Sequence, residues 1–238
     1  MTSGTSIEWT EATWNPVTGC SKVSPGCAHC YAERMAKRLQ AMGQPNYADG
    51  FAVRAHPHML DLPRRWARPK HVFVNSMGDL FHEDVDLSFV EQVFKTMNET
   101  PRHVFQVLTK RADRLAQLAP ELNWTANIWM GVTVEDNERL ARIERLMEVP
   151  ASVRFVSIEP LLTALPDLEV DGLDWVIVGG ESGPGARPVN PDWVRDIRNR
   201  CVADDVPFFF KQWGGARRKK AGRELDGARW DEMPRHIA

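Results

Sequence analysis

Three cysteines near the start of the chain, Cys20, Cys27 and Cys30, are the residues whose spacing most clearly predicts chemistry. They form a C-x6-C-x2-C pattern, and Gly19 and Gly26 let the backbone between them turn tightly. A structural zinc ion usually has four protein ligands. A [4Fe–4S] cluster held by three thiolates instead leaves one iron open to a non-protein ligand. The pattern therefore predicts a metal centre, with an iron–sulfur cluster as its first interpretation.

Two other interpretations of the cysteines stay open. Zinc would need a fourth ligand, either His29 or a distant residue, and His29 lies between Cys27 and Cys30, where simultaneous ligation would be strained. The cysteines could also be incidental. Cys201, far along the chain, falls on the apolar face of a predicted helix, so we expect it to be a small core residue.

Composition places the chain among ordinary globular proteins. It has 238 residues, of which 43% are hydrophobic and 26% charged, with a formal net charge of −2. That balance excludes binding of nucleic acid through bulk charge, so such a partner would need a local basic patch. No apolar run approaches the ~18 residues of a membrane span. The N-terminal residues lack a secretion signal. We therefore expect a cytoplasmic protein with reduced cysteines and no membrane partner.

Short apolar runs alternate with helical patterns from residue 71 onward. The expected strands are rich in Val, Ile or Phe, as buried parallel strands usually are. They are His71–Asn75, His103–Leu108, Asn127–Val132, Val153–Ile158, Asp174–Val178 and Val206–Phe210, with a further short strand at Thr13–Thr18.

Four helices are expected from the spacing of apolar residues. One runs from Tyr31 to about Met42, with Met35, Ala36 and Leu39 also on its apolar side. The others carry characteristic residues: Phe89 to Met97 with a Ser88/Glu91 capping box, Leu140 to Met147, and a helix begun by Asn190 and Pro191.

This order of elements predicts an α/β fold with a parallel sheet. A closed eightfold barrel typically needs ~250 residues, so the length favours a TIM-like partial (βα)6-type barrel. An open doubly wound sheet is the alternative. We expect one domain over residues 1–238, divided into a cluster loop and first helix (12–43), an irregular insertion (44–70), βα repeats (71–212) and a basic C-terminal extension (213–238).

Polar residues follow the expected strands one after another. In parallel α/β folds ligands bind at the carboxyl ends of strands, so these residues are expected to share one site. They are Asn75, Ser76, Gly78 and Asp79; Thr109, Lys110 and Arg111; Thr133, Glu135, Asp136 and Asn137; Ser157 and Glu159; Gly179, Gly180, Glu181 and Ser182; and Lys211, Gln212 and Trp213.

The cysteine segment resembles the radical SAM superfamily, in which three cysteines follow the first strand of a partial barrel. The chain keeps the C-x2-C half of the common pattern, but it has six residues in the first gap and His29 in place of the usual aromatic residue. The resemblance implies a [4Fe–4S] cluster on Cys20, Cys27 and Cys30. It also implies S-adenosyl-L-methionine (SAM) as cofactor, reductive cleavage of SAM to a 5′-deoxyadenosyl radical, and a one-electron donor of the flavodoxin or ferredoxin type.

The wider text resembles a phage- and prophage-associated, radical-SAM-like family without an assigned reaction. The matching segments run from Trp9 to Cys20 and from Cys30 to Arg34, and they include Ser157-Ile-Glu-Pro-Leu-Leu, Gly179-Gly-Glu-Ser and Phe209-Phe-Lys-Gln-Trp-Gly-Gly.

The superfamily resemblance also allocates roles to the strand ends. It implies that Asn75, Ser76, Gly78 and Asp79 bind the methionine amino group of SAM, and that Thr133 and Glu135 bind its ribose. Gly179 and Gly180 would permit close backbone approach to the ligand. The remaining charged side chains are then expected to face the substrate and to act in catalysis: Glu159, Glu181 and Lys211, with Arg187 beside them.

Two basic stretches suggest a nucleic acid or nucleotide substrate, because Arg and Lys interleaved with aromatic residues suit phosphate contact and base stacking. One lies within Gln44–Lys70, and the other carries Arg217, Arg218, Lys219, Lys220, Arg223 and Arg229 beside Trp213 and Trp230. Solvated surface charge explains the same residues equally well. The alternative functions are a zinc-stabilised nucleic-acid-binding protein without catalysis and a non-catalytic iron–sulfur protein. A partner protein sharing the site is a further open expectation.

Overall fold

The computed structural model describes residue 5 and residues 7–216 and 222–234. Seven parallel strands form one curled sheet, a TIM-like partial barrel, in which the order in space equals the order along the chain. The strands are β1 (Ala12–Trp14), β4 (His71–Val74), β5 (Val104–Thr109), β6 (Ile128–Thr133), β7 (Val153–Ile158), β8 (Trp175–Gly179) and β9 (Phe208–Gln212). The predicted α/β partial barrel is confirmed.

Helices cover the outer face of the sheet, and aromatic residues fill the inner face. The helices are α1 (Tyr31–Ala41), α2 (Leu87–Asn98), α3 (Ala112–Leu118), α4 (Ala141–Met147) and α5 (Pro191–Ala203). Buried residues of α2 to α5 join the larger core cluster. The smaller cluster contains no helix residue and is built from the side chains on the other face: Trp9, Val104, Trp129, Val153, Phe155, Trp175, Ile177 and Phe209. Because the helices of that larger cluster cover one face, the doubly wound alternative is wrong.

Most expected elements lie where the sequence predicted them, with small shifts at their ends. The strand expected over Thr13–Thr18 is instead two strands, because Pro16 lacks an N–H and interrupts the pairing. After it, β2 (Val17–Thr18) turns away to pair antiparallel with β3 (Arg54–Ala55). The insertion between Gln44 and Lys70 otherwise holds short 3-10 turns, as its lack of periodicity indicated.

One local prediction about the helices is wrong, and two other features of the helices go beyond what the sequence predicted. The capping box at Ser88 does not form, since α2 starts at Leu87 with Asp86 as its N-cap residue. The apolar side of α1 is mostly not buried: only Ala36 is, and Met42 is 60% exposed. Helix α3 was missed because only two of its residues, Ala112 and Leu115, are buried, too few to give a recurring apolar face. The N-cap at Asn190 is confirmed by its hydrogen bond from the Asp192 N–H.

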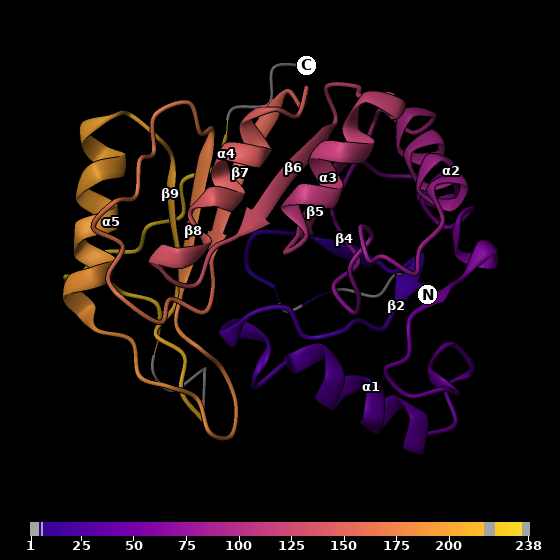
Figure 1. Cartoon of the computed structure of the whole chain (residues 1–238), viewed down its shortest axis with the longest axis horizontal. Coiled ribbons are helices and arrows are strands. Elements are labelled where there is room, and N and C mark those ends of the chain that lie inside the picture. The colour runs from indigo at the N-terminus through magenta and orange to yellow at the C-terminus, as the bar shows by residue number, and fades with distance from the viewer. Residues whose placement is uncertain (1–4, 6, 217–221, 235–238) are drawn as a thin grey trace.

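Register explains which residues reach the carboxyl edge together. Thr133 pairs with Ser157, Ser157 with Ile177, and Ile177 with Phe209, so these residues form one row across four strands. Glu135 and Glu159 lie two residues beyond Thr133 and Ser157 and so leave adjacent strands at one level. Figure 1 shows α1, in indigo, at one edge of the sheet and apart from α2 to α5.

A glycine on the inner face makes room for an aromatic ring. A Cβ atom built at Gly131 of β6 would lie 2.5 Å from the ring of Phe155 on β7, which is fully buried. We expect Gly131→Ala to lower the free energy of unfolding by about 1–3 kcal/mol, because the ring cannot move without straining the inner core. Urea unfolding measures this change. Phe155→Leu should restore part of the loss when combined with Gly131→Ala, and an unchanged midpoint in Gly131→Ala would contradict the packing argument.

Candidate functional site

The three cysteines lie on the loop between β2 and α1, at the carboxyl edge of the sheet. The loop enters beside β4, where Gly19 and Gly78 form a parallel bridge. A Cβ atom at Gly19, whose φ is +83°, would lie 2.1 Å from the carbonyl oxygen of Ala52, so only glycine fits there. The loop leaves through Cys30, whose sulfur accepts the N–H of Glu33 and caps α1.

Each cysteine sulfur has a different hydrogen-bond environment. The Cys20 Sγ accepts from Arg111 Nη1 at 3.3 Å, and the Cys27 Sγ lies 3.7 Å from the Ser24 hydroxyl. Cys27 is buried, while Cys20 and Cys30 are partly exposed. Burial, reinforced by Asp79, raises the pKa of the Cys20 thiol to about 11. Within the described ranges, no three Cys, His, Asp or Glu side chains are grouped closely enough to hold a metal ion as they stand.

Asp79, after β4, is the acceptor at one end of the site. Its carboxylate accepts from the Thr109 hydroxyl at 2.7 Å, the Lys110 N–H at 3.2 Å and Arg111 Nη1 at 3.2 Å. It is 5% exposed. The carboxylate therefore ties the end of β4 to the end of β5 and holds the Arg111 side chain against the cysteine loop.

Glu135, after β6, anchors the middle of that loop. It is fully buried and accepts from the Ser24 hydroxyl at 2.6 Å, from Lys110 at 2.8 Å and from Arg142 at 2.9 Å. Burial alone would raise the pKa of Glu135, but these donors outweigh it and lower the pKa. A Cβ atom at Gly26 would lie 2.5 Å from the Glu135 side chain, so glycine permits the contact.

Glu181, which follows β8, is connected to the same loop at His29 directly and at Pro25 through Arg187. Its carboxylate accepts from the Arg187 side chain and from His29 Nδ1 at 3.0 Å, and Arg187 also donates to the Pro25 carbonyl at 3.0 Å. Burial opposes ionisation, yet the hydrogen bonds from Arg187 and His29 hold the pKa of Glu181 at about 2. The β8–α5 connection is thereby clamped onto the segment that carries Cys27 and Cys30.

Glu159 and Lys211 form a separate ion pair that spans β8. The Lys211 ammonium lies 2.7 and 2.9 Å from the two Glu159 oxygens, and the Gln212 amide donates to the same carboxylate at 3.0 Å. The pair crosses over Gly179, which has no side chain to block it; a Cβ there would lie 3.4 Å from Glu159. Lys211 is 12% and Glu159 21% exposed at the side chain, so solvent reaches this pair.

The structure assigns several other predicted residues contacts within the protein. The Asn75 amide oxygen accepts the Val17 N–H and the Ser76 hydroxyl donates to Asn15, so both hold the β1–β2 turn. A Cβ at Gly180 would lie 2.1 Å from the Trp213 carbonyl oxygen, and one at Gly78 would lie 2.9 Å from the Gly19 carbonyl oxygen. Thr133 is buried, and its carbonyl accepts from Arg142. Their proposed roles toward a ligand stay predictions.

Hydrogen bonds that the sequence did not predict hold the site together, although Arg111 was expected among the strand-end residues and only Ser24 was not singled out. Arg111 reaches Cys20 and Asp79, Ser24 reaches Glu135, and His29 reaches Glu181. Lys110 and Arg111 directly follow an expected strand, and this position predicted that they lie at the site but did not predict their partners. The loop contacts join residues as much as 162 positions apart, and no local pattern predicts such pairs.

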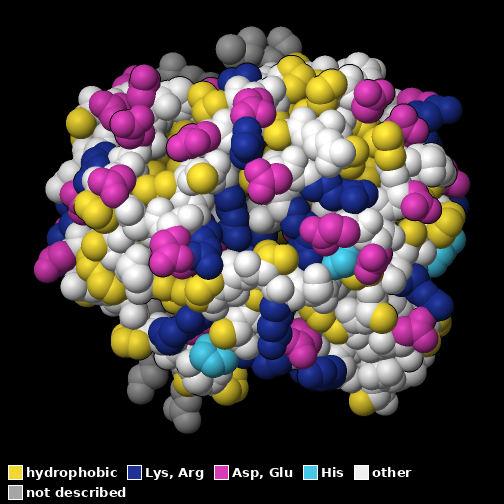
Figure 2. Space-filling view, viewed as in Figure 1, with side chains coloured by type: hydrophobic (Ala, Val, Ile, Leu, Met, Phe, Trp, Pro, Cys, Tyr) yellow, Lys and Arg dark blue, Asp and Glu magenta, His cyan; other side chains and the backbone are white. Residues whose placement is uncertain are grey.

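Four described arginines of the two basic stretches form ion pairs within the protein. Arg54 pairs with Asp49, Arg64 with Asp61 and Glu99, Arg223 with Asp231, and Arg229 with Glu224. Trp66 is buried against His103. Arg217, Arg218, Lys219 and Lys220 lie outside the described residues. Figure 2 shows Lys and Arg side chains gathered toward the middle of one face, where the strands approach α1 in Figure 1.

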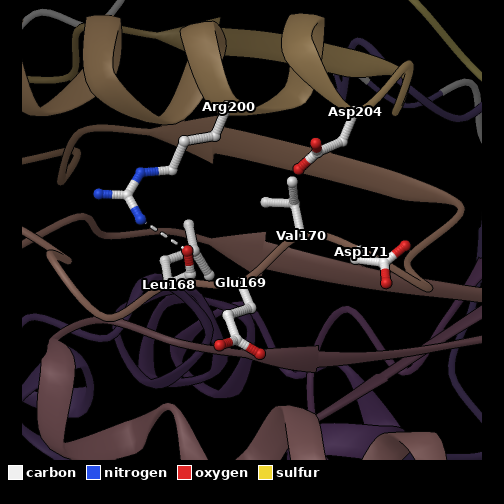
Figure 3. Close-up of a pocket in the computed structure, with 6 residues that line it drawn as sticks. All are labelled: Leu168, Glu169, Val170, Asp171, Arg200 and Asp204. Carbon is white, nitrogen blue, oxygen red and sulfur yellow. Dashed lines mark hydrogen bonds between the residues drawn. The ribbon is translucent and has the colours of Figure 1, made fainter.

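A cavity of about 340 Å³ lies away from these residues, between α5 and the segment that precedes β8. Figure 3 shows its lining, in which Arg200 donates to the Leu168 carbonyl at 2.8 Å. The other lining residues are Glu169, Val170, Asp171 and Asp204. Because this cavity lies toward the amino ends of β8 and β9, it is not part of the carboxyl-edge site. Among the described residues, no helix has the length and apolar character to cross a membrane.

Comparison with known proteins gives a family and a fold. A family model described as "Protein of unknown function (DUF5131)" matches residues 4–234. No curated protein matches the chain.

Solved structures of spore photoproduct lyase are similar in fold. A mutant with dinucleoside spore photoproduct has a TM-score of 0.51 and 11% identity, over 87% of this chain and 64% of that one. A second mutant gives 0.49 and 13%, over 84% and 63%, and the enzyme complexed with dinucleoside spore photoproduct gives 0.48 and 11%, over 87% and 65%. The chain thus spans less than two thirds of the structures it matches, and the likeness at such identity concerns the fold.

The contact between Ser24 and Glu135 predicts how firmly the cysteine loop is held. Ser24→Ala removes a hydrogen bond to a buried carboxylate, worth about 1.5–3 kcal/mol, and Gly26→Ala pushes a methyl group into Glu135. We expect both to open the loop, so that Cys27 in the metal-free protein is alkylated at least ~10-fold faster. Mass spectrometry after timed alkylation measures this rate. Ser88→Ala, at an exposed position on α2, is the control, and an unchanged rate in both loop variants would refute the anchor.

The lowered pKa of Glu181 predicts a pH-dependent stability. A carboxyl whose pKa is depressed in the folded state stabilises above its unfolded pKa and loses that contribution as the pH falls through the folded value. With a shift from 4.5 to about 2, the contribution is complete above about pH 4.5 and disappears toward pH 2. Glu181→Gln should therefore cost on the order of 3 kcal/mol at pH 7 and almost nothing near pH 2, by urea unfolding. Glu91→Gln on the surface of α2 is the control; a pH-independent difference for Glu181→Gln would contradict the linkage.

Proposed function

Because this chain belongs to the DUF5131 family of proteins of unknown function, its activity has to be inferred from the site, and we propose that it is a radical SAM enzyme. One observation carries the proposal: a loop with three cysteines is anchored at the carboxyl edge of a partial parallel barrel. The fold shared with spore photoproduct lyase is consistent with it.

The donor set fits a [4Fe–4S] cluster better than a single zinc ion. Three thiols come from one loop, and a cluster bound by three thiolates keeps one iron for an exogenous ligand. Zinc would need four ligands at about 2.0–2.3 Å, one more than the three cysteines of the loop supply. Cys20, Cys27 and Cys30 would hold the cluster, after loss of their protons.

When bound, such a centre would pass one electron from the donor protein to the SAM sulfonium, so that one C–S bond would break to give methionine and a 5′-deoxyadenosyl radical able to abstract hydrogen from a substrate. In this proposal the ends of β4 and β6 form the SAM side. Gly78 lies beside the residue that precedes Cys20, so the backbone at the end of β4 reaches the cysteine loop. Asp79 and Glu135 are already saturated with internal donors, so we assign them the task of fixing the loop and orienting neighbouring groups toward SAM.

The ends of β7 to β9 form the substrate side. Glu159 and Lys211 form their hydrogen bonds with each other and with Gln212, not with the described residues of the cysteine loop, and both are partly open to solvent. Lys211 Nζ donates hydrogen bonds to both carboxylate oxygens of Glu159. The pair would therefore offer a substrate one cationic donor and one carboxylate acceptor. Glu181, held as a carboxylate by Arg187 and bonded to His29, would keep the β8–α5 connection against the cysteine loop.

A nucleic acid or nucleotide is the proposed substrate class, and a flavodoxin- or ferredoxin-type protein the electron donor. Two features support the substrate: the Lys and Arg side chains near the middle of the face in Figure 2, which lie among Asp and Glu side chains, and the dinucleoside bound by the fold-related lyase.

Anaerobic reconstitution tests the function directly. We expect about four iron and four sulfide per chain after incubation with both, and 5′-deoxyadenosine, detected by chromatography, after addition of SAM and dithionite. Cys20→Ala, Cys27→Ala and Cys30→Ala should each abolish product, whereas Cys201→Ala, at a buried position away from the loop, should retain it. Short oligonucleotides should raise the yield and change in mass.

Other results would point elsewhere. Zinc in place of iron would indicate the nucleic-acid-binding protein without catalysis. A stable cluster that never cleaves SAM, with or without oligonucleotides, would indicate a non-catalytic iron–sulfur protein. Wild-type amounts of product from the Cys20→Ala, Cys27→Ala and Cys30→Ala variants would show that the loop is not the reactive centre.

A further inference from the structure

Arg111 joins one of the three cysteines to the strand ends. It follows β5, is 6% exposed, and uses all five of its N–H donors. Nη1 donates to the Cys20 sulfur at 3.3 Å and to Asp79 at 3.2 Å; Nη2 donates to the Ser21 carbonyl and hydroxyl at 3.3 and 2.8 Å; Nε donates to Glu83 at 2.9 Å.

We propose that Arg111 is a positioning residue that donates a hydrogen bond to the Cys20 sulfur and thereby raises the reduction potential of the cluster bound there. This inference rests on the proposed function for the cluster itself. The residue acts through Cys20 and touches neither SAM nor substrate in the proposal.

The expected effect of Arg111 on the reduction potential is electrostatic. Reduction adds an electron to the cluster and its sulfur ligands, so a cation and an N–H donor at a ligand sulfur stabilise the reduced form more than the oxidised form. Burial strengthens the effect because little water screens it. Among the described contacts of the three sulfurs, only that at Cys20 comes from a charged side chain; Cys27 has a hydroxyl nearby and Cys30 a backbone N–H.

The fixed geometry of Arg111 makes the interaction specific. Its backbone N–H donates to Thr109 Oγ1 at 2.9 Å, and the same hydroxyl donates to Asp79, so backbone and side chain are held by one network. A lysine would keep one positive charge but could not reproduce the planar fork that reaches Ser21, Cys20 and Glu83 at once. The negative charge of Asp79, in turn, opposes reduction.

Variants expected to shift the reduction potential in opposite directions test this proposal. In the reconstituted, SAM-free protein, the midpoint potential is measured by redox titration with electron paramagnetic resonance of the reduced cluster. We expect a lower potential for Arg111→Lys and a still lower one for Arg111→Gln, and a higher potential for Asp79→Asn, which removes a buried negative charge. Arg114→Gln is the matched control. Arg114 donates to the Glu83 and Val85 carbonyls of the β4–α2 connection, to which Arg111 also binds through Glu83, but it makes no described contact with a cysteine sulfur. Its replacement should therefore leave the potential unchanged.

A second measurement needs no variant. Protein grown with nitrogen-15 arginine should show a hyperfine coupling between a guanidinium nitrogen and the reduced cluster, by pulsed electron paramagnetic resonance. This measurement decides the matter if the Arg111 variants do not load a cluster.

Three results would overturn the inference. Fully loaded Arg111 variants with the wild-type potential would show that the residue does not tune the cluster. A shift of the same sign in Asp79→Asn and Arg111→Lys would indicate general damage, and absence of an arginine coupling would exclude the hydrogen bond. Failure of the proposed function is distinguishable, because a wild-type protein without iron and sulfide fails at metal analysis, before any potential is measured.

Discussion

The position of the cysteine loop depends on buried carboxylates at the carboxyl edge of the sheet. Cys27 is the only buried residue of the segment from Ser21 to Cys30, so the loop has almost no hydrophobic core of its own. Hydrogen bonds hold it instead, from Ser24 to Glu135 and from His29 to Glu181. Buried carboxylates are unfavourable unless they are paired. Each therefore requires its own cation, and these requirements fix Lys110, Arg142 and Arg187 around the loop.

The parallel sheet makes these contacts possible. Because the strands follow one another in space and in sequence, their carboxyl ends meet at one edge, and residues far apart in the chain face the same loop. Glycines then remove the remaining obstacles. Gly26 lets the loop approach Glu135, and Gly19 lets it pass the Ala52 carbonyl. The loop is thus shaped by close backbone approach and positioned by charge, while the aromatic inner core keeps the strands at their register.

The sequence predicted the fold well and the contacts of the site only in part. Strand runs such as Val153–Ile158 have a strong local signal, since a buried parallel strand is apolar along its whole length. The end-of-strand rule likewise brought Asp79, Glu135 and Glu181 to one edge. Their partners could not be predicted, because pairs such as Ser24 with Glu135 depend on three-dimensional proximity. Periodicity predicted the apolar side of α1 but could not predict its burial, and Met42 stays exposed. An apolar stripe shows which face a helix could bury, and only tertiary packing decides whether it does.

The two parts of the carboxyl edge, at the ends of β4 and β6 and at the ends of β7 and β9, differ in how far their charged side chains are buried and already hydrogen-bonded. At the ends of β4 and β6, Asp79 and Glu135 spend their acceptor capacity on internal donors and lie at 5% and 0% exposure. A ligand bound there would contact mainly backbone groups and the cluster proposed on the cysteine loop. At the ends of β7 and β9, Glu159 and Lys211 neutralise each other across Gly179 and remain partly exposed. An incoming polar group can exchange for one partner of that pair at less cost than it can break the buried anchors. The buried carboxylates at the ends of β4 and β6 therefore hold the cysteine loop, whereas the partly exposed pair at the ends of β7 and β9 is where we expect a substrate to bind.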